Sequence, residues 1–248
     1  MPEATLSVLL RFGKKLAAID DQVAFINNIC SDDAWPIVGE IGEGKIEGWE
    51  AQQLLKEIRS RIKRFEQPEE ILAKVLSFGD QFETARLTVI PGGETLESQR
   101  DNGVIGFRSN WHFNPEEIAR LSVSPSIGSE VIYLADLIEG SLDCTYDKVD
   151  ERDHVEAILD RLPKVEGLQW IVGNTTSINR VLANHLEETG VELLPTVYTR
   201  ASDTYNHPTY GLRRLFVGRL CSRRVRVDYL PPSRSDGSVG LFVLGVPA

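Results

Sequence analysis

The sequence predicts an α/β (or α+β) protein in which a helical N-terminal region precedes a mixed sheet. Three patterns favour this class: apolar residues at helical spacing before residue 83, a strand–helix–strand unit at 168–199, and short or alternating apolar runs from 215 onward, typical of antiparallel strands. We therefore divide the chain into a helical region, 1–83, and an α/β domain with a mixed sheet, 84–248. The sequence leaves open whether these two parts are separate domains or one domain.

The amino-acid composition limits the classes of protein to which the chain can belong. The 248 residues are 42% hydrophobic, enough to bury a sizeable core. No apolar run approaches the ~18 residues that span a bilayer, and Met1-Pro2-Glu3 does not begin a signal peptide. We expect a soluble cytoplasmic protein that is not associated with a membrane. The three cysteines lie far apart and match no zinc or redox spacing, so we expect them to be reduced and structural.

Charge is distributed unevenly along the chain. The net charge is −10, yet residues 213–248 hold seven arginines against Asp228 and Asp236, while residues 1–212 hold 20 Lys and Arg against 35 Asp and Glu. Few aromatic residues are interleaved with these arginines, which argues against a nucleic-acid partner. Pairing with the protein's own acidic surface or with a partner protein is the favoured role.

The N-terminal region is predicted to be helical. Apolar residues at helical spacing indicate helices within 3–30 and over 49–65, separated by a glycine-rich loop at 35–48. That loop fits neither glycine fingerprint for phosphate binding. Pro68-Glu69-Glu70 begins a further helix, with proline in the first turn and acids where the helix dipole favours them.

Strand patterns begin at Arg86. Leu87–Ile90 reads as a strand closed by the turn 91–93, with 103–107 as its partner. The remaining predictions are a helix that begins at Asn114, a strand at 131–134, a helix at 151–162 behind Asp150, and C-terminal strands at 215–217, 225–229 and 241–244.

The stretch 168–199 has the plan of a βαβ unit. Trp170–Val172 is nearly all apolar, Thr175 or Thr176 can cap a helix, and Gly190 ends it. The second strand, 191–199, contains Pro195, which suggests an edge position or a bulge.

A polar segment at 200–210 follows this unit and is predicted to be a loop. Parallel strands end on the same edge of a sheet, so this loop should lie beside the turn 174–177, with the next strand starting there. Helix N-terminal amides, hydroxyls and two guanidinium groups would then meet in a site suited to an anion. The predicted ligand-binding residues are Asn174, Thr175, Thr176, Ser177, Arg200, Asp203, Tyr205, Asn206, His207, Tyr210, Arg213 and Arg214.

Two functions remain open. The first is a non-catalytic binding or regulatory protein that holds an anionic small molecule or a protein partner at the carboxyl edge of its sheet. The second is a hydrolase or transferase acting on a phosphate-bearing or nucleotide substrate, with His207 or Tyr205 in proton transfer. No catalytic motif selects the second, and no cofactor is indicated. The acid-rich segment 136–156 matches no EF-hand loop, so we assign no metal site.

Overall fold

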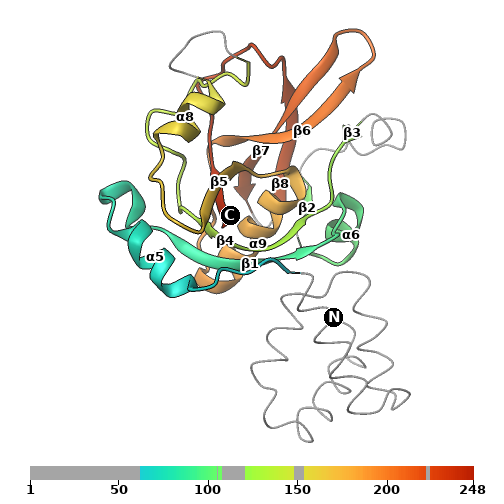
Figure 1. Cartoon of the computed structure of the whole chain (residues 1–248). Helices are drawn as coiled ribbons and strands as arrows, with labels where there is room; N and C mark the ends of the chain where they lie inside the picture. Colours follow the sequence, from blue (N-terminus) through green and yellow to red (C-terminus); the bar gives the residue numbers. More distant parts are fainter. Residues whose placement is uncertain (1–61, 105, 108–120, 148–153, 222–223) are drawn as a thin grey trace, which may run out of the picture.

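The computed structural model describes residues 62–104, 106–107, 121–147, 154–221 and 224–248 (Figure 1). The predictions for residues before 62, the helix start at Asn114 and the acids at 148–153 lie outside these residues. The end predicted for the helix over 49–65 is wrong, because residues 62–65 are not helical and Lys63 forms a parallel bridge with Ser129. Helices and two sheets are both present, so the α/β class is confirmed.

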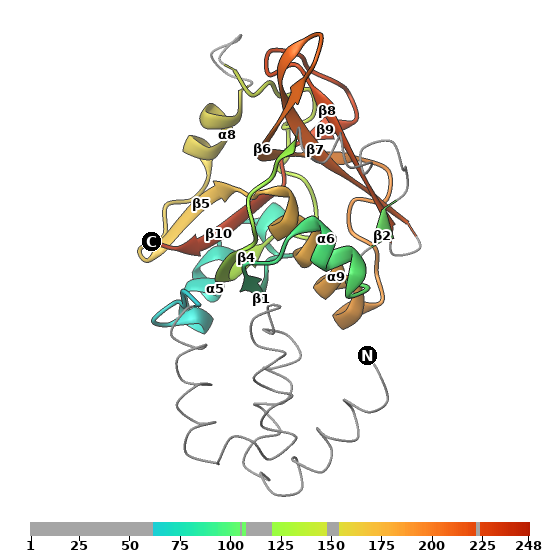
Figure 2. The ribbon, with the colours of Figure 1, turned by 90° about the vertical axis from the view of Figure 1, so that its right-hand side faces the viewer.

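The first sheet is antiparallel throughout. Its order is β1 (Arg86–Gly92), β4 (Ile127–Tyr133), β10 (Val243–Pro247) and β5 (Leu168–Val172). The C-terminal strand β10 therefore lies in the interior of the sheet, between two strands that precede it in the chain (Figure 2).

The second sheet is mixed. Its order is β2 (Gly106–Phe107), β8 (Arg224–Leu230), β7 (Gly211–Cys221), β6 (Tyr198–His207) and β3 (Leu121–Ser122), with β9 (Val239–Gly240) parallel to β6. The predicted antiparallel C-terminal strands are confirmed. The prediction that the strand at 103–107 pairs with the strand at 87–90 is wrong. Strand β2 pairs with β8 in this sheet, whereas β1 pairs with β4 in the other sheet.

The described helices are α5 (Pro68–Leu76), the short 3-10 helix η1 (Asp80–Phe82), α6 (Leu96–Asp101), α8 (Val155–Arg161) and α9 (Thr175–Thr189). Helices α5 and α9 follow their sequence signals, whereas α6 was not predicted and α8 has His154, not Asp150, as its N-cap. Pro68 stands in the first turn of α5 with Glu69 and Glu70, as predicted. Gly190 ends α9 in the left-handed conformation, with φ of 72°.

Helix α9 packs between the two sheets. Its buried residues Ile178, Val181 and Leu182 join one core cluster with side chains of both sheets, such as Tyr133 and Leu215. The other face of the first sheet forms a second cluster with α5 and α8, so this sheet is covered on both faces.

The strand, helix and strand predicted at 168–199 follow one another along the chain, but the two strands do not pair with each other. The second strand starts at Tyr198 rather than 191 and belongs to the second sheet, so it does not pair in parallel with β5. Two features explain the difference: β10 occupies the inner edge of β5, and Leu193 and Leu194 are buried in the core as part of the connection. The two strands meet only near Gly173, whose carbonyl accepts from the Ser202 amide at 3.0 Å.

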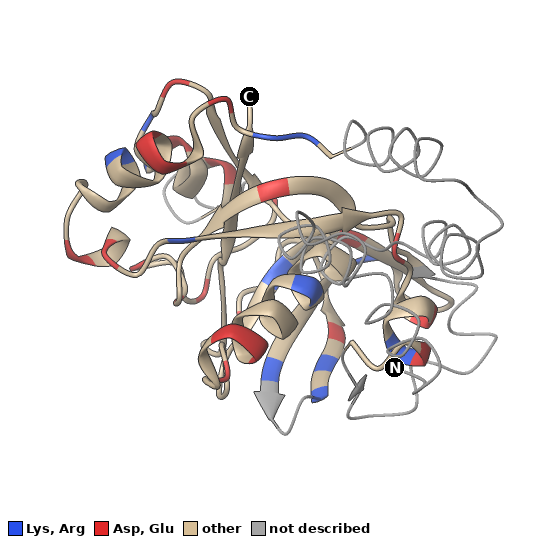
Figure 3. Ribbon diagram, turned by 90° about the horizontal axis from the view of Figure 1, so that it is seen from below, with Lys and Arg blue, Asp and Glu red and all other residues tan. Residues whose placement is uncertain are grey.

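Charged residues of both signs are interspersed over the described ribbon (Figure 3). None of the described helices combines the length and the apolar character needed to cross a bilayer.

Candidate functional site

Three of the four polar side chains in the turn 174–177 make hydrogen bonds within the protein, whereas the buried Thr175 hydroxyl has no partner among the described residues. Asn174 is the capping residue, and its Oδ1 accepts from the Ser177 amide at 2.9 Å. The Thr176 hydroxyl donates to the Ser124 carbonyl at 2.8 Å, and the Ser177 hydroxyl accepts from the Ile127 amide at 3.1 Å. All these side chains are buried, so their polarity serves to fix the helix to the chain before β4.

The anion at this helix N-terminus is Asp203. Its carboxylate accepts from the Thr175 amide at 2.5 Å and from the Ser124 amide at 2.9 Å, and the side chain is only 4% exposed. Burial raises the pKa of Asp203, while the amide hydrogen bonds oppose that rise. The predicted proximity of 174–177 to residues after 200 holds, but the protein's own carboxylate takes the position predicted for a ligand.

The predicted loop at 200–210 is wrong, because residues 198–207 form β6 and 208–210 form the turn into β7. Alternation along a strand sends neighbouring side chains to opposite faces. The arginines Arg213 and Arg214 accordingly have different surroundings: Arg213 lies over the Tyr210 ring, whereas Arg214 lies over the Tyr146 ring. The predicted site residues therefore separate into two groups.

The first group is a row of aromatic rings that leads from the core to the end of the β6–β7 hairpin. Tyr205, which is buried, stacks on Tyr229 with ring centroids 4.7 Å apart. His207 follows at 5.5 Å from Tyr229 and at 4.5 Å from Tyr210. Tyr210 is 64% exposed, so the row ends at the surface.

His207 is oriented by the turn. Its Nδ1 accepts from the backbone amides of Thr209 at 3.1 Å and Tyr210 at 3.2 Å, which assigns the ring proton to Nε2 when the imidazole is neutral. The adjacent Tyr205 is buried and packs edge-on against His207 at 5.8 Å. Asn206, beside them on β6, is exposed. This arrangement suits a rigid contact surface.

The second group lies on the other face of the hairpin and contains Arg200 and Arg214, which we call the arginine pair. Arg214 Nη1 donates to the Ser202 carbonyl at 2.8 Å, and its guanidinium carbon lies 3.9 Å from the centroid of the Tyr146 ring. The Nε of Arg214 is buried and has no hydrogen-bond partner among the described residues.

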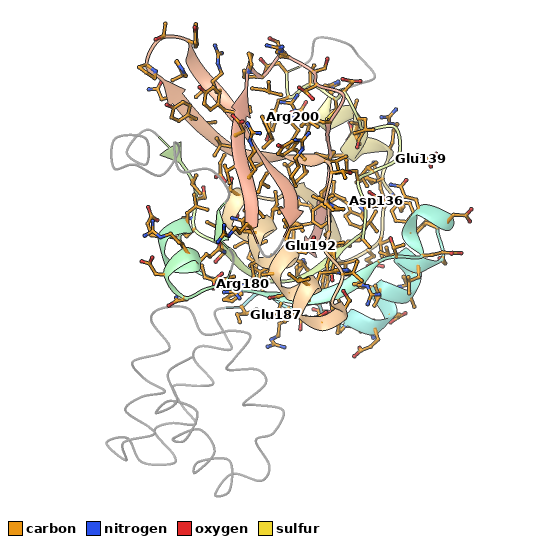
Figure 4. All side chains as sticks on the ribbon, turned by 180° about the vertical axis from the view of Figure 1, so that it is seen from behind. Asp136, Glu139, Arg180, Glu187, Glu192 and Arg200 are labelled. Atoms are coloured by element: carbon orange, nitrogen blue, oxygen red, sulfur yellow. The ribbon has the colours of Figure 1, made fainter. Side chains whose placement is uncertain are left out.

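Arg200 is labelled in Figure 4. Its side chain is fully buried, with 0% exposure. Its Nη2 donates to the carbonyls of Cys144 at 2.8 Å and Arg234 at 2.5 Å. Its Nε and Nη1 have no partner in the described part of the chain, and burial lowers the pKa of the guanidinium. An arginine nevertheless keeps its charge at any physiological pH.

Two residues of this neighbourhood were missed by sequence reasoning. Cys144 and Tyr146 lie in the acid-rich segment 136–156, where neither a motif nor a periodic pattern distinguishes them. Cys144 is free and buried, in agreement with the structural role predicted for it. Within the described residues, no group of three or more His, Cys, Asp or Glu side chains is arranged to hold a metal ion.

Comparison of the chain with protein-family models, with curated proteins and with solved structures gave no match. The candidate site is therefore defined by its geometry alone.

Proposed function

We propose that this is a non-catalytic binding protein that recognises a partner protein through the end of the β6–β7 hairpin. We call residues 206–213 the hairpin tip. The observation that carries the proposal is the aromatic row, because it connects the exposed Tyr210 to buried Tyr205 through His207 and Tyr229.

The chemistry of the hairpin tip favours a protein partner. Tyrosine and arginine are enriched among the residues that contribute most to protein–protein binding. Tyr210 and Leu212 are large side chains that stay 64% and 55% exposed, and Arg213 lies over the Tyr210 ring at 5.5 Å. Ring packing holds these groups in place before binding, which lowers the entropy lost on association.

Charge suggests the character of the partner surface. Residues 204–213 contain Arg213 and no acidic residue, although the whole chain carries a net charge of −10. Asp203, the nearest acid before them, is buried at the start of α9. An acidic segment on the partner would complement the hairpin tip.

Site-specific photo-crosslinking tests the proposal. A photoreactive phenylalanine analogue replaces Tyr210 in the full chain expressed in its native cells, and the matched control places it at Phe78, which is 48% exposed next to α5. We expect one main adduct at Tyr210, absent at Phe78, joined to an acidic segment of another protein. Arg213→Glu in the Tyr210 variant should abolish it, because the charge complementarity is reversed.

Three results would contradict the proposal. These are equal adducts at Tyr210 and Phe78, an adduct that survives Arg213→Glu, and an adduct of the protein with a second copy of itself.

A further inference from the structure

Some guanidinium nitrogen atoms of the arginine pair have no acceptor among the described residues. Three buried nitrogen atoms, Nε and Nη1 of Arg200 and Nε of Arg214, find no hydrogen-bond partner among the described residues. No carboxylate oxygen of those residues lies within 4.0 Å of either guanidinium group. Buried charges in folded proteins are nearly always paired, and an unpaired one points to an acceptor other than the described side chains.

Two nearby acids, Asp203 and Asp236, make hydrogen bonds to other groups. Asp203 accepts from the Ser124 and Thr175 amides at the start of α9. Asp236, in the connection after β8, accepts through Oδ1 from the Ser238 amide at 2.9 Å and from the Ser238 hydroxyl at 2.7 Å. Neither forms an ion pair with Arg200, so the positive charge of that side chain is neutralised only at a distance.

Arg180 shows what an internally satisfied arginine looks like in the same molecule (Figure 4). Its guanidinium group contacts Glu94 through two nitrogen atoms, with Nε 2.9 Å from Oε2, and both side chains are largely buried. Among the described residues, one buried arginine thus has a carboxylate partner and the other has none.

We propose that the arginine pair binds a small oxyanion, a carboxylate or phosphate group, beside Cys144 and Tyr146. Arg214 and Tyr146 are half-buried, whereas Arg200 is fully buried and donates to two backbone carbonyls. The guanidinium groups of both arginines donate to the oxygen atoms of the anion. This site is on the opposite face of the hairpin from Arg213 and is independent of the hairpin tip.

Thermal unfolding of the full chain with simple anions tests this assignment. Inorganic phosphate and acetate are titrated separately, and sodium chloride at matched ionic strength serves as the blank. We expect a saturable increase in melting temperature with at least one of the two oxyanions and none with chloride beyond the general salt effect. The oxyanion that saturates at the lower concentration identifies the preferred group.

Variants locate the effect. Arg214→Gln, at a half-buried position, should raise the half-saturating concentration by about tenfold, and Arg200→Met should abolish the shift. Arg213→Gln is the matched control, because the same substitution one residue away acts on the opposite face and should leave the titration unchanged. The assignment is overturned if neither oxyanion stabilises the wild type, or if Arg214→Gln responds like Arg213→Gln.

Discussion

Asp203 and Arg200 lie three residues apart on β6, and both are buried, yet the protein treats their charges in opposite ways. Asp203 accepts from two backbone amides and caps a 15-residue helix. Arg200 donates through one nitrogen to two carbonyls and leaves two other nitrogen atoms unpaired within the described chain. The comparison shows that burial alone does not distinguish the two charges. Complete pairing is what a structural charge requires, and the incomplete pairing of Arg200 is the basis of the oxyanion site that we propose.

The carboxylate of Asp203 and the guanidinium group of Arg200 also differ in how their buried charge can be neutralised. Burial raises the pKa of Asp203 and lowers that of Arg200, so each shift favours the neutral form. A carboxylate reaches its neutral form by taking up a proton in mildly acidic solution. A guanidinium group stays charged and can be neutralised only by a partner.

The largest effect is expected where a satisfied buried arginine is removed. Arg180→Met leaves the Glu94 carboxylate, which is 4% exposed, without its guanidinium partner. We expect a loss of about 3 to 5 kcal/mol in the free energy of unfolding, measured by urea denaturation. Adding Glu94→Met should restore part of that loss. A loss below about 1 kcal/mol would mean that the pair is not held together in solution.

The second largest loss of stability is expected when Asp203 is substituted. Asp203→Ala leaves the amides of Ser124 and Thr175 buried without an acceptor, and we expect a loss of about 3 kcal/mol in the same assay. Asp203→Asn, which keeps one acceptor oxygen, should lose less. If the two variants were equally stable, the amide contacts would not be what Asp203 contributes.

The pH dependence of stability separates the two charges further. Because burial raises the pKa of Asp203, the folded protein keeps this proton to higher pH than the unfolded chain, whose Asp pKa is about 3.9. Across that interval only the folded state binds the proton, so stability falls as pH rises. Urea midpoints from about pH 4 to 7 should therefore decline more in the wild type than in Asp203→Asn. Parallel curves would show that the pKa is not raised.

The smallest effect is expected for Arg200→Met without added oxyanions. No described carboxylate loses an ion pair. The carbonyls of Cys144 and Arg234 lose one donor, but the removal of a buried charge without a carboxylate partner offsets that cost. We expect the free energy of unfolding to stay within about 1 kcal/mol of the wild type or to rise. A loss as large as that of Arg180→Met would show that Arg200 is satisfied within the protein, and the comparison with Asp203 would fail.

Local signals in the sequence predicted much of the fold. Pro68 and the two glutamates after it mark the start of α5, and Gly190 marks the end of α9, because caps act through neighbouring backbone groups. Pairing between distant segments could not be predicted in this way. The Trp170–Val172 run identifies a strand, but nothing in it reveals that β10 is its partner.

The candidate site was predicted in part. The proximity of 174–177 to the residues after 200 was predicted from a parallel strand pairing that is absent, yet the contact of Asp203 with the Thr175 amide confirms the proximity itself. The segment 200–207 was mistaken for a loop because it is polar, although Thr204 and Tyr205 are good strand formers. Its polar residues could not be sorted onto two faces before the strand was known, so Arg213 and Arg214 were assigned to one site instead of two.

The position of β10 inside the first sheet has a consequence for synthesis on the ribosome. Strands β1, β4 and β5 are all made before it, but β4 and β5 are joined only through β10. During translation, the sheet edges that β10 will cover stay unpaired until residues 243–247 have left the ribosome. The emerging chain should therefore depend on rapid completion, or on a chaperone that covers those edges, more than a protein whose sheets form in chain order.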